Sequence, residues 1–354
     1  MLSSARPGIR ATPYNVFDPL LIDNFNRPDG ALGTAYNGQA WSTIGGTPVI
    51  STARFTSSSG SSKADIPMPG AVGNVAISVD CDPGSSALGD QAYMVVDFFK
   101  DPATSECYQI ELSERNWFFI YFNSVGTQII LTTGSLGYTY STPFRLYITA
   151  EYIGGVMYYQ IDTSNLTGGP HTTLTKGSYW NQVTNGSHLQ LRCNPTQFFD
   201  NLRNTTTTLP VVSFGNLGIN SSFISNLGST NMLLHYTVAS NGGSASPQHW
   251  GVSQLRTNSS DFTQGYRYQW ADSTAATDYI INEDAGERSV DSIGFCRGLG
   301  DFKFMMQGST INFSSRAGVN NSTSMSDPTI DANTYLGVAT TARSTVTNIT
   351  AMPL

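Results

Sequence analysis

Apolar residues in this chain recur in short runs with a period of two, and Gly, Asn and Pro stand between the runs. The runs are rich in β-branched and aromatic residues, which is typical of strands on a pleated surface. No window shows convincing helical spacing. We therefore expect an all-β fold, with strands at VAISVD (75–80), AYMVVDFF (92–99), CYQIEL (107–112), NWFFIYF (116–122), TQIILTT (127–133), FRLYITAEY (144–152) and VMYYQID (156–162).

The same series of strands recurs later in the chain. Residues 74–79 resemble 231–236, and Tyr93 and Trp250 stand at matched positions. The order of the segments is kept from one copy to the next, and only the loop lengths differ, which indicates a tandem repeat of one β-domain. The further matches are CYQIEL with GYRYQW (265–270), FRLYI (144–148) with FKFMM (302–306), and 189–202 with 336–349.

The two copies divide at NTTTTLP (204–210), a threonine run that ends in proline. We expect an N-terminal arm over 1–20, a first jelly-roll β-sandwich over 21–203, a linker over 204–210 and a second, shorter jelly-roll β-sandwich over 211–354. The number of strands in each copy favours two packed sheets over a small barrel. The first copy carries an N-terminal addition, residues 23 to about 66, and the second has only VVSFGNLGINSSF (211–223) in its place.

Composition excludes several classes of partner. Charged residues make up 12% of the chain, against roughly 25% in typical soluble proteins, so the surface must consist mainly of neutral hydrogen-bonding groups. The net charge of −7 argues against a nucleic acid ligand. No apolar segment is long enough to predict a signal peptide or a membrane span. The four widely spaced cysteines predict buried free thiols rather than a disulfide framework or a CxxC metal site.

The most patterned stretch is DNFNRPDGALG (23–33), in which Pro28-Asp29-Gly30 has the chemistry of a tight turn. Trp41 and Gly45-Gly46 follow it, and FFDNLR (198–203) closes the first copy. This arrangement resembles the concanavalin A-like, laminin-G-like jelly roll of bacteriophage tail and fibre proteins. The resemblance implies that the opening motif leads into the first strand, and that a terminal strand ending near Asp-Asn pairs back beside it. The second copy lacks the opening motif.

The resemblance also implies a virion protein that assembles in the host cytoplasm, with other virion proteins as partners and with homo-oligomerisation. Our first hypothesis is a non-catalytic minor tail, tail-tip or fibre component that packs against subunits or contacts a host-surface glycan. A capsid decoration or head-fibre protein is the alternative, with residues 1–20 as an anchoring arm. A polysaccharide depolymerase is a third hypothesis, from a different class of protein.

Catalytic clusters are missing from the sequence. A glycan-cleaving site needs two carboxylates across a groove, and acids clustered at i, i+2 and i+4 on one strand would signal it. Glu111 and Glu114 are spaced i,i+3, which places them on opposite faces of a strand, and the acids at 283, 284 and 287 surround a glycine turn. The four histidines are scattered, and no HExxH, GxSxG or nucleotide-binding motif occurs. We therefore expect a protein that is not an enzyme and that needs no cofactor.

Two weaker kinds of site remain open. Calcium, which loop carboxylates can bind, is possible if Asp23, Asp29 and Asp200, together with Asp18, approach one another; otherwise these residues cap turns and strand ends. For glycan contact the candidates are aromatic and amide side chains near Gly-rich turns, with packing in the core or between subunits as the alternative. They are Tyr138, Tyr140, Tyr179, Trp180 and Asn181. Trp41, Tyr93 and Trp250 are expected in the core.

Overall fold

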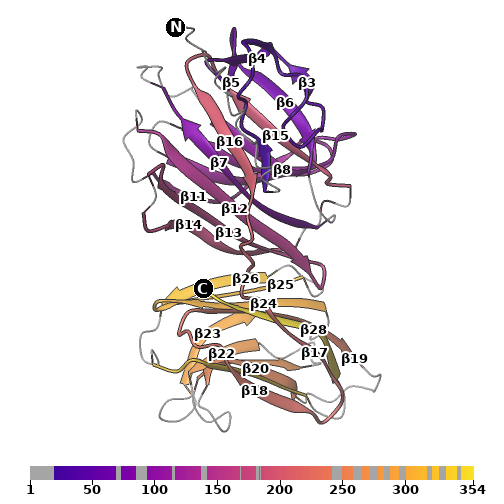
Figure 1. The fold of residues 1–354 in the computed structure, drawn as a ribbon. Coiled ribbons are helices and arrows are strands. Elements are labelled where there is room, and N and C mark those ends of the chain that lie inside the picture. Colours follow the sequence, from indigo (N-terminus) through magenta and orange to yellow (C-terminus); the bar gives the residue numbers. More distant parts are fainter. Residues whose placement is uncertain are drawn as a thin grey trace, which may run out of the picture.

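A computed structural model shows an all-β chain of tandem sandwiches, which confirms the predicted fold class. Figure 1 shows the two sandwiches one above the other. Within the described part of the chain, no helix has the length and apolar character that crossing a membrane requires. The structure describes residues 20–68, 73–84, 94–113, 116–136, 142–167, 169–180, 183, 185–240, 249–257, 265–271, 278–282, 288–294, 300–316, 321–326, 332–340 and 344–354.

The first sandwich consists of a nine-stranded and a seven-stranded antiparallel sheet. The nine-stranded sheet has the order β14 (Thr172–Tyr179), β13 (Val156–Asn165), β12 (Phe144–Ile153), β7 (Asn74–Asp82), β16 (Phe198–Asn204), β5 (Arg54–Ser57), β4 (Pro48–Ser51) and β2 (Gly30–Ala31), with β1 (Leu21–Asp23) beside β16. The seven-stranded sheet has the order β11 (Gln128–Ser135), β10 (Asn116–Phe122), β9 (Cys107–Leu112), β8 (Met94–Lys100), β15 (His188–Cys193), β6 (Ser62–Pro67) and β3 (Ser42–Gly45).

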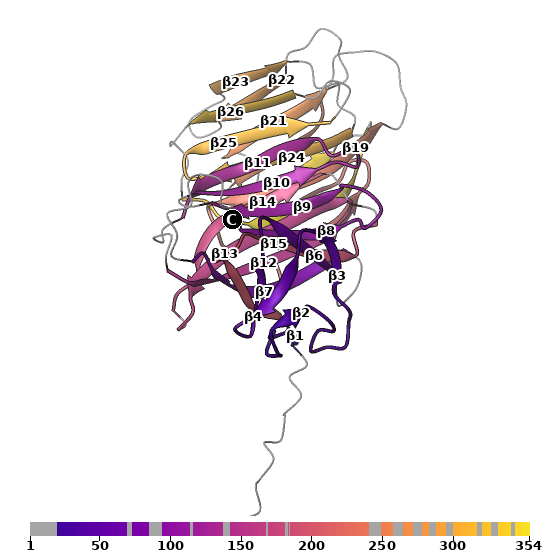
Figure 2. The same cartoon turned by 90° about the horizontal axis from the view of Figure 1, so that it is seen from above.

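The second sandwich has two six-stranded sheets among its described residues. The near sheet, which packs on the first sandwich, has the order β17 (Val212–Leu217), β28 (Ser344–Pro353), β19 (Met232–Ser240), β24 (Gly300–Gln307), β25 (Thr310–Ser315) and β26 (Asn321–Ser326). The far sheet has the order β18 (Ser222–Asn226), β27 (Tyr335–Thr340), β20 (His249–Thr257), β21 (Tyr266–Ala271), β22 (Asp278–Asn282) and β23 (Arg288–Gly294). In Figure 2, β22 and β23 lie on the opposite side of the molecule from β1, β2 and β4.

The strand order repeats from one sandwich to the next. The path β14-β13-β12-β7-β16-β5 in the first corresponds to β26-β25-β24-β19-β28-β17 in the second, and β11-β10-β9-β8-β15-β6 corresponds to β23-β22-β21-β20-β27-β18. The expected closure also holds, because Leu21 pairs with Arg203 and Asp23 with Leu202 across β1 and β16. β17 and β18 therefore take the places of β5 and β6.

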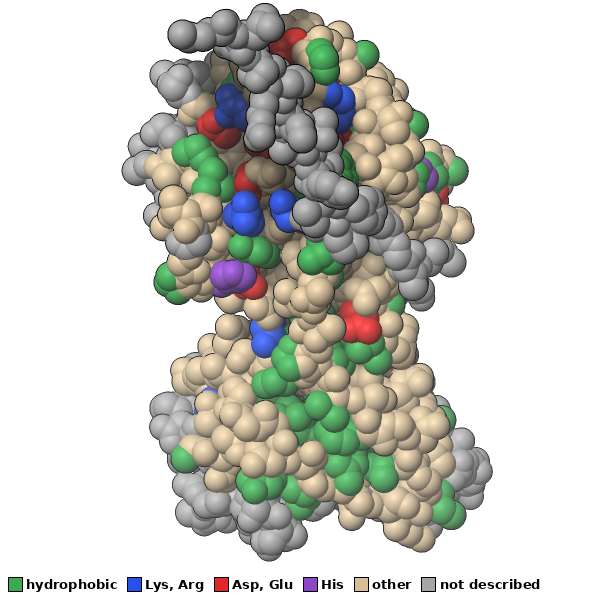
Figure 3. Space-filling view, in the orientation of Figure 1, with side chains coloured by type: hydrophobic (Ala, Val, Ile, Leu, Met, Phe, Trp, Pro, Cys, Tyr) green, Lys and Arg blue, Asp and Glu red, His purple; other side chains and the backbone are tan. Residues whose placement is uncertain are grey.

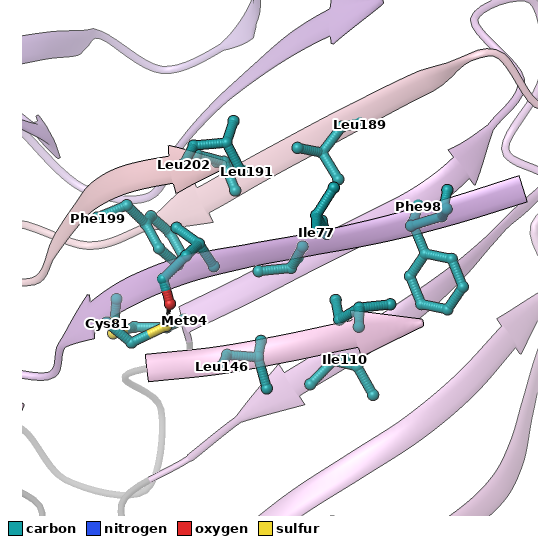
Figure 4. Close-up of a cluster of buried hydrophobic side chains, with 14 of the residues drawn as sticks. Ile77, Cys81, Met94, Phe98, Ile110, Leu146, Leu189, Leu191, Phe199 and Leu202 are labelled. Atoms are coloured by element: carbon teal, nitrogen blue, oxygen red, sulfur yellow. Dashed lines mark hydrogen bonds between the residues drawn. The ribbon is translucent and has the colours of Figure 1, made fainter. Parts of the chain in front are cut away.

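Each sandwich encloses its own apolar core. In the first, side chains of alternate residues on facing sheets interdigitate, among them Ile77, Phe98, Ile110 and Leu146 (Figure 4). The second core is built on Tyr236, Phe302 and their neighbours. Trp41 lies in the first core, as expected, whereas the side chains of Tyr93 and Trp250 fall outside the described residues. Cys81, Cys107 and Cys193 are buried free thiols, and Cys296 lies outside the described residues.

A third apolar cluster joins the two sandwiches. It contains Val156 and Tyr158 from β13, Leu209 from the segment between β16 and β17, Leu233 from β19 and Met352 from β28. Because Leu209 is buried there, the segment predicted as a linker is packed into the junction along part of its length. The outer face of the nine-stranded sheet and the near sheet of the second sandwich are therefore in contact.

Candidate functional site

The opening motif builds a structural network around Asp23. This carboxylate is fully buried and accepts two hydrogen bonds from Arg27, at 2.8 and 2.9 Å. It also accepts hydrogen bonds from the indole of Trp41 at 2.7 Å and from the backbone N–H of Phe25 at 2.9 Å. Since Arg27 and Trp41 occupy both oxygens, Asp23 holds the first turn in place.

The other two carboxylates predicted for calcium do not join Asp23 in a metal site. Asp29 is exposed and accepts a hydrogen bond from the backbone N–H of Thr52 at 2.8 Å. Burial raises the pKa of Asp200 to about 6, and its oxygen accepts the backbone N–H of Asn201. Among the described residues, no group of three or more His, Cys, Asp or Glu side chains is placed to hold a metal ion. Asp18 lies outside them.

The predicted glycan-binding aromatics have different locations. Tyr179 packs against the first core, with its ring 5.5 Å from that of Tyr121, so the alternative interpretation as a core residue applies to it. Trp180 lies at the junction of the sandwiches, 5.6 Å from the ring of His235. These two neighbours therefore do not form one exposed platform. Tyr138, Tyr140 and Asn181 lie outside the described residues.

A polar cluster that the sequence did not predict lies on the outer face of the seven-stranded sheet. Four side chains cross adjacent strands in one row, because Gln190 pairs with Asp65 and with Asp97, and Asp97 pairs with Gln109. We call these four residues the polar row. Their neighbours in sequence, such as Ile110 and Leu191, face the core. Strand alternation thus directs the row away from the core.

The polar row is largely withdrawn from solvent. Each of its four residues is only 4% exposed, while Arg192 and Glu111, on the strands β15 and β9, are half-buried beside it. Gln109 donates a hydrogen bond to Glu111 at 2.8 Å and accepts one from Arg192 at 3.4 Å. Gln190 donates to Asp65. The accessible part of this site therefore consists of Arg192 and Glu111, and the row below fixes their positions.

Burial controls the charge of the carboxyl groups at this site. It raises the pKa of Asp97 to about 7, and the nearby Arg192 guanidinium only partly opposes this. Burial also raises the pKa of Glu111, and the charge of Arg192 opposes this shift. Burial likewise raises the pKa of Asp65, and the hydrogen bond from Gln190 opposes that shift. A carboxyl group that is about half protonated at neutral pH can both donate and accept a hydrogen bond.

Two atoms in this cluster lack a hydrogen-bond partner within the described part of the chain: Oδ1 of Asp97 and Nε of Arg192. Both are buried, and a buried polar atom without a partner costs about 1–3 kcal/mol. Oδ1 of Asp97 is an acceptor, or a donor when the carboxyl group is protonated, and Nε of Arg192 is a donor. A ligand that carries hydroxyl groups has the complementary chemistry, because a hydroxyl both donates and accepts.

The corresponding face of the second sandwich has a different composition. There Gln254 takes the place of Asp97. It pairs with Gly337 in the place of Gln190 and with Arg267 in the place of Gln109. Ala339 follows Gly337 at the position that corresponds to Arg192. Among the described residues, the repeat thus preserves the strands of the first sandwich but not its polar cluster.

The sequence does contain a signal for this site. Polar residues spaced i,i+2 occur in HLQLRC (188–193), in CYQIEL (107–112) and in SKADIP (62–67), and Asp97 interrupts an apolar strand. Glu111, which the sequence does not assign to a site, is half-buried on this face. Glu114 and the acids at 283, 284 and 287 lie outside the described residues.

No family model matches the chain, and no curated protein matches it. Solved structures similar to it include the carbohydrate binding module CBM66 from Bacillus subtilis, which is 13% identical over 47% of this chain and 95% of that one, with a TM-score of 0.36. A Bacillus licheniformis β-glucanase is 10% identical over 52% and 97%, with a TM-score of 0.31. Domains LG4-5 of mouse laminin α1 are 11% identical over 83% and 86%, with a TM-score of 0.25.

Proposed function

We propose that this chain is a non-catalytic structural protein of a bacteriophage virion, and that the first sandwich contacts a host-surface glycan through the polar row, Arg192 and Glu111. The observation that carries the glycan proposal is the pair of buried, unpartnered polar atoms on Asp97 and Arg192. A sugar hydroxyl can both donate and accept a hydrogen bond, which is the chemistry that these two atoms lack. The half-buried Phe118 on the neighbouring strand β10 adds an apolar ring of the kind on which sugars stack.

The virion part of the proposal is supported by the opening motif and by the composition of the surface. The face drawn in Figure 3 is mostly neutral, with its charged side chains gathered mainly on the first sandwich. Such a surface suits packing against identical neighbours and against other virion proteins. We place the protein in the tail, tail tip or fibre, after assembly in the host cytoplasm. Capsid decoration or a head fibre is the alternative location.

Glycan binding is tested with the full chain on an array of host cell-wall glycans. We expect binding by the wild-type protein, and at least a tenfold loss in Arg192→Gln and in Asp97→Asn. The first removes the unpartnered Nε–H group, and the second replaces a carboxyl group that can donate or accept by an amide whose donor and acceptor atoms are fixed. Arg267→Gln changes a residue on the corresponding face of the second sandwich and serves as the matched control. Equal binding by all four proteins would contradict the assignment of the site.

Location is tested by imaging an intact particle. Density for the two sandwiches on the tail supports the proposal, density on the head supports the alternative, and a particle without this chain overturns both.

A depolymerase remains the second candidate, since the pKa of Asp97 near 7 and the adjacent Glu111 are properties of an acid–base pair. Incubation with host cell-wall polysaccharide distinguishes the two functions. New reducing ends that accumulate with wild-type protein but not with Asp97→Asn would overturn the non-catalytic proposal. A bound polysaccharide that stays intact supports it.

A further inference from the structure

A pocket of about 120 Å³ lies at the junction of the two sandwiches, remote from the polar row in the fold. The turn at 154–155 between β12 and β13 and Trp180 after β14 line it from the first sandwich. His235 of β19, Asp301 of β24, Arg316 and Asn348 line it from the second. Arg316, Asn348 and the two glycines of the turn are exposed, so the pocket opens to solvent.

His235, one of the residues that line the pocket, has an unpartnered ring nitrogen. His235 is 2% exposed, and its Nε2 lies 2.5 Å from the hydroxyl oxygen of Ser178. Its Nδ1 has no hydrogen-bond partner within the described part of the chain. Burial and the neighbouring Lys303 hold the pKa of His235 well below its usual value, so the ring is neutral at pH 7. In either tautomer a hydroxyl group satisfies Nδ1, because a hydroxyl can donate or accept.

The other lining groups favour a ligand with both a carboxylate and hydroxyls. The Arg316 guanidinium lies 5.8 Å from the centre of the Trp180 ring, and a guanidinium matches the geometry of a carboxylate. Asp301 accepts the hydroxyl hydrogen bond of Thr237 at 2.7 Å through Oδ1, and its carboxylate faces the pocket as an acceptor for a second hydroxyl. The amide of Asn348 both donates and accepts.

The size of the pocket limits the ligand to one ring. An engineered cavity of roughly 150 Å³ accepts one benzene molecule. A pocket of about 120 Å³ is smaller than that cavity, but it is open on one side, so one edge of a single six-membered sugar ring can enter it while the rest of the ring stays in solvent. The Trp180 ring offers such a sugar an apolar surface. Residues 154 and 155 are glycines with φ of 61° and 82°, so no side chain narrows this wall.

We propose that the junction pocket binds a single hexuronic acid residue, with its carboxylate on Arg316 and its hydroxyls on Asp301, Asn348 and Nδ1 of His235. The ligand would contact both sandwiches at once and would therefore stabilise their packing. This site is separate from the polar row, and it also accommodates a terminal uronate of a longer acidic glycan.

The test is a titration of the full chain with D-glucuronic acid at pH 7, monitored through the imidazole ¹⁵N NMR signals of the four histidines. We expect the His235 signals to shift with glucuronic acid, and D-glucose to bind at least tenfold more weakly because it lacks the carboxylate. Arg316→Gln should weaken glucuronic acid binding at least tenfold and leave glucose binding unchanged. Arg316 is exposed, and glutamine replaces it with a polar side chain that has no charge.

Arg192→Gln is the matched control at the polar row and should not change the His235 response. If the glycan proposal is wrong, Arg192→Gln binds the glycan array as well as the wild type does. If the pocket proposal is wrong, this appears in the glucuronic acid titration. The pocket proposal is overturned if saturating glucuronic acid leaves the His235 signals in place, or if Arg316→Gln binds it as tightly as wild type does.

Discussion

At the scale of single residues, two aspartates of the first sandwich show how burial gives the same side chain different roles. Asp23 is fully buried but has a partner for each of its oxygens, so it stabilises the fold. Asp97 is also buried, but one of its oxygens lacks a partner among the described residues. The second aspartate therefore costs stability, and we assign to it a role in binding.

Asp23→Asn should destabilise the first sandwich by about 3–5 kcal/mol, because it leaves the Arg27 guanidinium without its counter-charge in a mostly buried position. Asp29→Asn is the matched control from the same motif. Asp29 is exposed, and an asparagine oxygen can still accept the Thr52 N–H, so its effect should stay within about 0.5 kcal/mol. Urea unfolding of both variants measures the difference, and equal midpoints would show that the Asp23 network contributes little.

Asp97→Asn should stabilise the protein, and more so at pH 8 than at pH 5. The folded-state pKa of about 7 lies above the unfolded value near 4, so the folded protein holds a proton between these pH values that the unfolded chain releases. The wild type therefore loses stability as the pH rises from about 4 to 7, by up to about 1.4 kcal/mol per pH unit. Asparagine has no such titration. Thermal melts at the two pH values, with Arg267→Gln as control, measure this, and a pH-independent difference would contradict it.

At the scale of strands, glycines opposite aromatic residues fix how neighbouring strands pack. Gly134 of β11 pairs with Trp117 of β10, and a Cβ atom at Gly134 would lie 2.8 Å from the Trp117 ring. Gly177 of β14 stands in the same relation to Tyr159 of β13. The rings cover the glycines, which leaves no room for a side chain there.

Gly134→Ala should therefore destabilise the first sandwich by about 1–3 kcal/mol, since the Trp117 ring must move out of a packed position. Gly169→Ala is the matched control, because a Cβ atom there meets no atom within 4 Å. Chemical denaturation followed by tryptophan fluorescence reports both variants. If the alanine at position 134 is tolerated as well as that at 169, the glycine is not required for packing.

The strands were predictable from sequence because alternation is a local property. CYQIEL and NWFFIYF coincide with β9 and β10, and the remaining predicted strands overlap β7, β8, β11, β12 and β13. The polar row was not predictable in the same way. Asp97 and Gln190 meet only because β8 and β15 are neighbours in the sheet, although they are far apart in sequence. Each strand revealed its own polar residues, but only the topology shows that they form one row.

At the scale of the whole molecule, the repeat extends to irregular backbone. Phe99 near the end of β8 and Arg256 near the end of β20 both have positive φ, at 48° and 53°. Asn201 of β16 and Asn348 of β28 do so as well, at 46° and 53°. Such values are uncommon for residues other than glycine, so matching positions indicate that each copy keeps the same bends in its strands. The side chains of the candidate site differ between the copies, whereas these backbone bends are the same.

The packing of the two sandwiches should weaken as the pH falls below about 6.5. His235 is buried between them, close to Ser178, Tyr158 and Trp180 of the first sandwich and paired with Lys303 on β24. Its pKa is held well below the usual value by burial, so below about 6.5 the unfolded chain takes up a proton that the folded protein does not. The stability of the folded protein therefore decreases as the pH decreases, by up to about 1.4 kcal/mol per pH unit. Asp301 and Arg316 line the same pocket as His235, and the neighbouring Lys303 has a pKa that burial lowers to about 8, so Lys303 titrates in a higher range.

His235→Gln removes this titration and keeps an acceptor for the Ser178 hydroxyl. We expect thermal melts between pH 7.5 and 4.5 to show the wild type losing stability relative to His235→Gln, with the difference growing at each step below pH 6.5. His171→Gln is the matched control, because His171 is exposed and lies on the ring of Tyr147, away from the junction cluster. A constant difference between wild type and His235→Gln across this range would show that the junction accommodates the imidazolium, and that the packing of the sandwiches does not depend on the neutral ring.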